Sequence, residues 1–229
     1  MRISAVIVAA GTGRRIGGSI PKQFRELCGK PVLFYTLQKF ENCDLIDDIL
    51  IVTAESWLHF VSQEIVDRFC FEKVKKIISG GERRQDSVFA GIKALDGRPD
   101  LVAIHDAVRP FISIEKIRET VAACEKHGAA ILAVPPKDTV KTERSGFVDR
   151  TLFRDSLWSV QTPQIFKLQI LEAAFREAHQ NGLLQTDDSA LVERAGYSVK
   201  IVEGEYKNIK ITEPIDLELA KLILRTEQE

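Results

Sequence analysis

AAGTGRRIGGSIPKQF, residues 9–24, is the stretch on which the fold of this chain is decided. It follows Ile3–Ala9, an apolar run typical of a buried strand. Two close glycines stand beside Arg14 and Arg15, and Lys22 follows at the far end. Glycine lets a ligand approach backbone N–H groups, and cations neutralise phosphate oxygens. We therefore predict a phosphate-binding loop after the first strand, in preference to an ordinary loop with solvated arginines.

The loop does not match the two standard phosphate-binding motifs. A dinucleotide-binding motif needs glycine three positions after Gly13, where Ile16 stands. A P-loop needs lysine directly after its second glycine, but serine follows Gly18. Pro21 also discourages an immediate helix. The sequence therefore predicts a long, open loop with Lys22 as its most distant cation.

The global composition is that of an enzyme rather than a nucleic-acid-binding or membrane protein. The 229 residues are 45% hydrophobic and 28% charged, enough for a sizeable core. The net charge of −1 provides no basic field, so we expect neither nucleic acid nor a membrane as partner. The four cysteines are scattered without a C-x-x-C pair, which argues against zinc and disulfides and favours a cytoplasmic location.

Strand-like and helix-like patterns alternate along the first 134 residues, which predicts an α/β fold with a mostly parallel sheet and helices on both faces. The predicted strands are Ile3–Val8, Ile49–Val52, Val74–Ile78, Leu101–Ile104 and Ala130–Val134, and the predicted helices are Val32–Phe40, Leu58–Phe69, Asp86–Leu95 and Ile114–Glu125. In such folds ligands bind beyond the carboxyl ends of the strands. The residues that follow each strand are therefore the candidate site.

Residues 79–88, SGGERRQDSV, follow the third predicted strand. The glycine pair permits a sharp turn, and Ser87 falls in the first turns of the next helix. The segment could hold a base or a phosphate. Taken alone, it is explained more simply as a glycine turn before a helix, with Arg83 and Arg84 exposed to solvent.

Residues 105–110, HDAVRP, follow the fourth predicted strand. Asp106 could hold Mg²⁺ at the end of the strand or could cap a helix or loop, and the pattern favours neither. Arg109 is placed to bind an anionic group. His105 is best interpreted as a packing residue with satisfied hydrogen bonds.

Residues 135–165 are polar and long for a simple connection, and such excursions often mediate function or association. A hairpin is predicted between Thr139–Thr142 and Phe147–Leu152, around a Ser-Gly turn. This arm, taken as residues 136–160, has too little apolar surface to fold alone. We expect it to pack on a partner subunit.

The C-terminal region contributes further polar candidates. The Asp pair after Thr186 resembles a pair of metal ligands, but Thr186 capping a helix with acids in its first turn explains it more simply. A strand is predicted at Val199–Val202. Lys210 is expected on another strand, pointing at the crevice, and Thr212 precedes a strong helix start.

Together these motifs resemble the 2-C-methyl-D-erythritol 4-phosphate cytidylyltransferase family in order and spacing. They are AAGTGRRIG…PKQF, GGERRQDSV, HDAVRP, DTVK, RDSLWSVQTPQ, TDDSALVE and NIKIT. Seven ordered motifs are far more specific than any single one. The resemblance implies one Rossmann-like nucleotidyltransferase domain over residues 1–229, and a homodimer locked by exchange of the arm. It also implies Mg²⁺-dependent transfer of CMP from CTP to methylerythritol phosphate, with release of pyrophosphate.

The resemblance also implies residue roles. Those expected to bind CTP are Ala9, Ala10, Gly11, Gly13, Gly81, Glu82 and Ser87, and those expected to act in catalysis are Arg15, Lys22, Arg154 and Lys210. Those expected to bind the polyol phosphate are Arg109, Thr139, Thr162 and Thr186, with Asp106 on Mg²⁺. Thr139 and Arg154 would come from the other subunit. Two departures are mild: Glu82 stands where members often have Asp, and Ile16 replaces a common Met.

Two other functions remain open at this point. A cytidylyltransferase for another polyol phosphate, such as ribitol 5-phosphate, could share the fold, although such relatives tend to have Gly where Ala10 stands. A non-catalytic nucleotide-binding module is the alternative from another class. Cations at both ends of the crevice, Arg15 and Lys210 among them, argue against pure binding.

Overall fold

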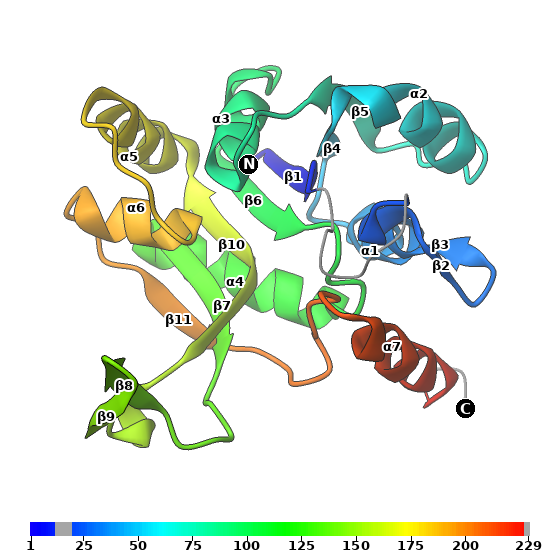
Figure 1. The fold of residues 1–229 in the computed structure, drawn as a ribbon. Helices are drawn as coiled ribbons and strands as arrows, with labels where there is room; N and C mark the ends of the chain where they lie inside the picture. The colour runs from blue at the N-terminus through cyan, green and yellow to red at the C-terminus, as the bar shows by residue number, and fades with distance from the viewer. Residues whose placement is uncertain (12–19, 227–229) are drawn as a thin grey trace.

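A computed structural model of the chain describes residues 1–11 and 20–226. These residues form a seven-stranded sheet in the order β11-β7-β10-β6-β1-β4-β5, with helices on both sides (Figure 1). β10 runs antiparallel to both of its neighbours, and every other adjacent pair is parallel. The predicted α/β fold with a mostly parallel sheet is confirmed.

Most elements lie within two residues of their predicted positions. The sheet strands are β1 (Ile3–Ala9), β4 (Asp48–Thr53), β5 (Val74–Ser79), β6 (Leu101–Asp106), β7 (Ala129–Val134), β10 (Ser159–Lys167) and β11 (Lys200–Glu203). The helices are α1 (Val32–Glu41), α2 (Leu58–Phe60), α3 (Arg84–Lys93), α4 (Ile114–His127), α5 (Leu168–Gln180), α6 (Asp188–Arg194) and α7 (Pro214–Thr226). Shorter elements are β2 (Glu26–Leu27), β3 (Lys30–Pro31), the 3-10 turns η2 (Lys22–Phe24), η3 (Glu55–Trp57) and η5 (Arg154–Ser156), and the π-helical η4 (Val61–Asp67), which continues α2.

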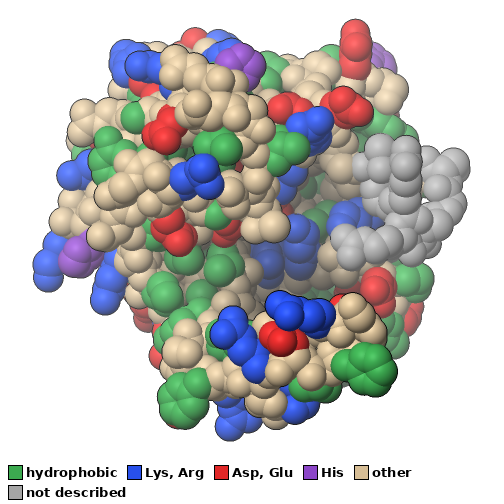
Figure 2. All heavy atoms as spheres, turned by 60° about the vertical axis from the view of Figure 1, so that its left-hand side comes forward, with side chains coloured by type: hydrophobic (Ala, Val, Ile, Leu, Met, Phe, Trp, Pro, Cys, Tyr) green, Lys and Arg blue, Asp and Glu red, His purple; other side chains and the backbone are tan. Residues whose placement is uncertain are grey.

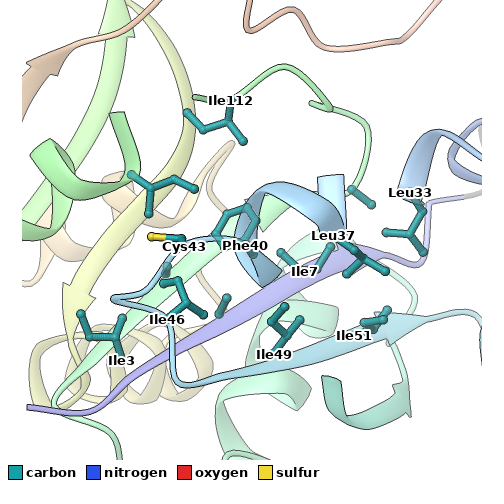
Figure 3. Packing of buried hydrophobic residues seen from close by; sticks show 14 of the residues in the cluster. Ile3, Ile7, Leu33, Leu37, Phe40, Cys43, Ile46, Ile49, Ile51 and Ile112 are labelled. Carbon is teal, nitrogen blue, oxygen red and sulfur yellow. The ribbon is translucent and has the colours of Figure 1, made fainter. Parts of the chain in front are cut away.

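Side chains of each strand alternate between the two faces of the sheet, and each face is covered by its own helices. On one face α1, η4 and α4 pack against Ile3 and Ile7 of β1. Figure 3 shows Leu37 and Phe40 of α1 beside Ile7 in this cluster. On the other face α3, α5 and α6 cover Val6 and its neighbours. Because both of their faces are buried, β1, β4, β6 and β7 are largely apolar runs, which made them predictable.

The inner strand β10 was not predicted, and the interpretation of residues 135–165 as one polar excursion is wrong for residues 159–165, which belong to this strand. Residues 161–166 are buried between β6 and β7. Gln161, Thr162 and Gln164 are nevertheless polar, so the strand lacks an apolar pattern. Their side chains are hydrogen-bonded to other parts of the chain, which removes the cost of burying them.

The predicted hairpin is present and projects from the sheet (Figure 1). β8 (Lys141–Arg144) pairs antiparallel with β9 (Phe147–Thr151). Ser145 and Gly146 both have positive φ angles, 53° and 86°, as the tight turn requires. Phe147 and Phe153 are 79% and 73% exposed, so the arm carries uncovered apolar surface.

Two local expectations are wrong. Lys210 lies on an irregular segment that joins β11 to α7, and not on a strand. The N-cap of α6 is Asp187, whose side chain accepts a hydrogen bond from the N–H of Ala190, and not Thr186. The start of α7 agrees with expectation, because the Asp216 carboxylate accepts from the backbone and hydroxyl of Thr212.

Candidate active site

Two adjoining cavities lie at the carboxyl ends of β1 and β6. The loop cavity is lined by Val8, Ala9, Ala10, Gly11, Lys22, Gln23, Gly81, Glu82, Arg83, Ser87 and Val108. The β10 cavity is lined by Arg109, Val160, Gln161, Thr162, Gln164, Thr186, Asp187, Ser189 and Glu193. Arg84, Asp106 and Lys210 line both. Figure 2 shows Lys and Arg side chains in a hollow on this side of the molecule.

Asp106, the last residue of β6, is the negative charge at the junction of the cavities. One carboxylate oxygen lies 3.0 Å from Arg84 Nε and the other 2.7 Å from Lys210 Nζ. Burial opposes ionisation, but the charges of Arg84 and Lys210 outweigh it and hold the pKa of Asp106 well below its usual range. Asp106 is therefore an ionised carboxylate held by two cations.

His105 has the packing role expected of it. Its ring is fully buried, 4.9 Å from the ring of Phe40. Nε2 donates to the carbonyl of Arg109, so Nδ1 of the neutral ring accepts from the hydroxyl of Thr162, each at 3.1 Å. That hydroxyl oxygen also accepts the N–H of Asp106 at 3.1 Å. Through this chain, β10 positions the end of β6.

The buried His105 ring gives a pH prediction. Burial lowers its pKa from 6.5 to about 4. Because the unfolded chain takes up this proton first, the contribution of His105 to stability is fully present above about pH 6.5 and is lost as the pH falls to about 4. NMR titration of the histidine rings checks this, with the exposed ring of His127 in the same spectra for comparison. A His105 signal that titrates between pH 6 and 7 would contradict the expectation.

Arg109 is held as a fixed cation facing the β10 cavity. Its Nη1 donates to the carbonyl of Asn208 at 2.8 Å, and Nη2 to that of Val160 at 3.4 Å. Its Nε is buried and has no hydrogen-bond partner among the described residues. Burial lowers the pKa of Arg109, opposed by Asp106. A guanidinium held in this way on the wall of a cavity is a fixed positive charge suited to an anion.

The walls of the loop cavity are held by local hydrogen bonds. The buried amide of Gln23 donates to the carbonyls of Ala9 and Gly11 at 2.5 and 2.9 Å, which fixes the chain leaving β1. On the opposite wall the N–H of Gly81 donates to Ser87 Oγ at 3.2 Å, and that hydroxyl donates to the carbonyl of Arg83 at 3.0 Å. Ser87 therefore shapes the glycine turn that the sequence predicted.

Comparison with known proteins identifies the family. Residues 3–226 match the family model described as IspD: 2-C-methyl-D-erythritol 4-phosphate cytidylyltransferase. The chain belongs to this family. The cytidylyltransferase of that name from Caldanaerobacter subterraneus is 44% identical over 98% of this chain and 100% of its own length. The one from Geotalea uraniireducens is 43% identical over 99% and 98%.

Solved structures agree with this assignment. The 4-diphosphocytidyl-2C-methyl-D-erythritol synthase from Anaerococcus prevotii is similar with a TM-score of 0.87 and 35% identity, over 98% of this chain and 96% of that one. The 2-C-methyl-D-erythritol 4-phosphate cytidylyltransferase from Francisella tularensis has a TM-score of 0.83 and 35% identity, over 97% and 99%.

The residues expected to act in this member of the cytidylyltransferase family separate between the two cavities. Those at the loop cavity are Ala9, Ala10, Gly11, Lys22, Gly81, Glu82 and Ser87, those at the β10 cavity are Arg109, Thr162 and Thr186, and Asp106 and Lys210 lie at both. Thr139 and Arg154 are exposed on the arm and line neither cavity. Gly13 and Arg15 lie outside the described residues.

The expectation that Arg84 is exposed to solvent is wrong. Its side chain is 28% exposed and pairs with Asp106 and with Asp188, whose Oδ2 lies 2.9 Å from Arg84 Nη2. One sequence signal could have found it. Ser87 and Val88 lie three and four positions after Arg84, so all three share one face of α3, and that face is buried.

Proposed function

We propose that the chain transfers CMP from CTP to 2-C-methyl-D-erythritol 4-phosphate, giving 4-diphosphocytidyl-2-C-methyl-D-erythritol and pyrophosphate. Family membership supports the reaction. The structural observation that supports this reaction most directly is the pair of cavities that meet at Asp106 and Lys210. A transfer between two phosphates needs two binding sites with one shared, charged junction.

The loop cavity takes CTP in this proposal. The backbone of Ala9, Ala10 and Gly11 surrounds the phosphates and the turn at Gly81 faces the base. Gly13, which lies outside the described residues, is given the same role as Gly11. Glu82 is exposed at the mouth, so base recognition rests mainly on the backbone of this turn, whose shape Ser87 holds.

A prediction follows for Gly80, which lies beneath this turn. A Cβ at Gly80 would be 2.6 Å from Ser87 Oγ and 2.7 Å from the Cβ of Ala10. Gly80→Ala must therefore push apart the two walls of the loop cavity, and we expect CTP binding to weaken about tenfold or more. Calorimetric titration with Mg·CTP measures this, with Ser79→Ala as the neighbouring control. Wild-type affinity in Gly80→Ala would contradict this location for CTP.

The β10 cavity takes the polyol phosphate. Arg109 supplies positive charge for the phosphate from the wall of this cavity, which Thr162 and Thr186 also line. Thr139 and Arg154 would complete it from the arm of a second copy. The exposed Phe147 and Phe153 support this homodimer, since a partner would cover them. We take residues 1–229 as a single domain with residues 136–160 as its dimerisation arm.

The chemistry requires no general base. The attacking group is a phosphate oxygen that is anionic near neutral pH; it forms a bond to the α-phosphorus of CTP as the bond to the bridging oxygen breaks and pyrophosphate leaves with the electron pair. The chain's contribution is to bring two anions together and to neutralise the departing charge. Arg15, Lys22, Arg154 and Lys210 supply the cations. The neutral, buried His105 is not placed to act as a base.

Asp106 suits Mg²⁺, which stabilises phosphate charge when bound. The described residues contain no group of three acidic, His or Cys side chains that could hold a metal by themselves. Mg²⁺ commonly binds through one or two carboxylates and takes its other ligands from phosphates and water. Asp106 offers one such carboxylate, ionised, and Lys210 would have to leave it, which frees that lysine for a phosphate.

A pyrophosphate-release assay tests the proposed reaction. We expect turnover with CTP and methylerythritol phosphate, and far less with ribitol 5-phosphate. Turnover with ribitol 5-phosphate alone, or with neither, would overturn the proposal. A cytoplasmic location is part of the proposal, and the four free thiols support it. Within the described residues no helix is long and apolar enough to cross a bilayer.

A further inference from the structure

Arg84 joins two carboxylates that come from different parts of the chain. Its Nε faces Asp106 at the end of β6, at 3.0 Å, and its Nη2 faces Asp188 in the first turn of α6, at 2.9 Å. Asp188 is 1% exposed, so its carboxylate is buried against this guanidinium. Arg84 is thus the cation that balances this buried charge.

The ion pair between Arg84 and Asp188 is not needed to begin α6. Asp187 caps that helix, and Gln164 of β10 donates to Asp187 and accepts from the N–H of Ser189, at 2.7 and 3.0 Å. Burial raises the pKa of Asp188 even with the charge of Arg84 beside it, so placing this carboxylate in the interior carries a cost. A buried ion pair is weak evidence for stability and often adds less than apolar packing. We therefore look for a role of the Arg84–Asp188 pair other than stabilising the fold.

The neighbouring residue on α3 makes the same connection. The amide of Gln85 donates to the carbonyl of Leu183 at 2.9 Å and accepts from the N–H of Gln185 at 3.1 Å. Gln85 thus contacts the segment just before Thr186, and Arg84 contacts it just after. Both residues stand at the start of the helix that carries Ser87, on the CTP side of the site.

We propose that Arg84 is a positioning residue that holds the CTP half and the polyol-phosphate half of the site in register, by fixing Asp106 and the Thr186–Asp188 segment with one guanidinium. This rests on the proposed function. The planar fork of arginine can face two carboxylates in fixed directions, whereas lysine is a single point charge. A displacement of about 1 Å between reacting groups can cost about 100-fold in rate.

Steady-state kinetics of three variants test the proposal, at a temperature where each is folded by circular dichroism. We expect Arg84→Met to lower kcat about 10- to 100-fold and to raise the KM for methylerythritol phosphate more than that for CTP. Arg84→Lys keeps the charge without the planar fork, so its kcat should lie between those of the wild type and of Arg84→Met. The double variant Arg84→Met/Asp188→Asn removes the uncompensated carboxylate, so its melting temperature should exceed that of Arg84→Met while its kcat stays low.

The double variant separates positioning from stability. A kcat within twofold of wild type in Arg84→Met/Asp188→Asn, or in Arg84→Lys, would overturn the proposal. A residue that only stabilises the fold should not affect kcat once the variant is folded. Arg118→Met is the matched control, since it breaks an arginine–aspartate pair with Asp44 on the surface and should leave kcat unchanged. Failure of the proposed function is distinct: the wild type itself would then show no turnover.

Discussion

Lys22→Ala is expected to lower turnover about 100- to 1,000-fold while the chain stays folded, and Arg15→Ala should behave alike. Lys22 lines the loop cavity at the start of η2, next to Gln23, which holds the carbonyls of Ala9 and Gly11. Removing a cation there leaves the charge on the departing pyrophosphate unbalanced. The measurement is kcat from pyrophosphate release at saturating CTP and methylerythritol phosphate.

Folding and assembly are checked in the same samples by melting temperature and elution volume, both of which should match the wild type. Lys126→Ala, which removes an exposed lysine from the last turn of α4, serves as control and should keep full activity. Near-wild-type turnover in both Lys22→Ala and Arg15→Ala would contradict the catalytic roles proposed for these two residues.

Asp106→Asn is expected to reduce turnover by a comparable factor of about 100 or more. Asn keeps the size of the side chain but leaves Arg84 and Lys210 facing one another without their shared negative charge. In the proposed site it would also remove the carboxylate that Asp106 offers to Mg²⁺. We therefore expect the Mg²⁺ concentration for half-maximal activity to rise together with the fall in kcat.

A surface substitution provides the control for Asp106→Asn. Asp44→Asn breaks the exposed pair with Arg118 and should change neither kcat nor the Mg²⁺ requirement. If Asp106→Asn kept both the wild-type kcat and the wild-type Mg²⁺ requirement, Asp106 could not be the metal ligand.

The parts of the fold that could be predicted have a strong local pattern. β1 and β6 are apolar because both faces of the sheet are covered, and the arm was found within two residues because its Ser-Gly turn demands positive φ angles. β10 was missed for the opposite reason. Its buried Thr162 and Gln164 have partners on β6 and α6, and hydrogen bonds to distant elements leave no periodic pattern in the strand.

The sequence by itself determined the family, the order of the parallel strands along the chain, and the polar residues that follow them, because runs of apolar residues and ordered motifs are local properties. Only the tertiary structure decided which of these residues meet. β10 enters the sheet between β6 and β7 and sets Thr162 against His105 and Asp106. Lys210 reaches Asp106 across about a hundred positions of sequence, and Arg84 turns inward to join it. Charges so far apart along the chain come together only through the order and direction of the strands, because the packing of the sheet fixes their positions.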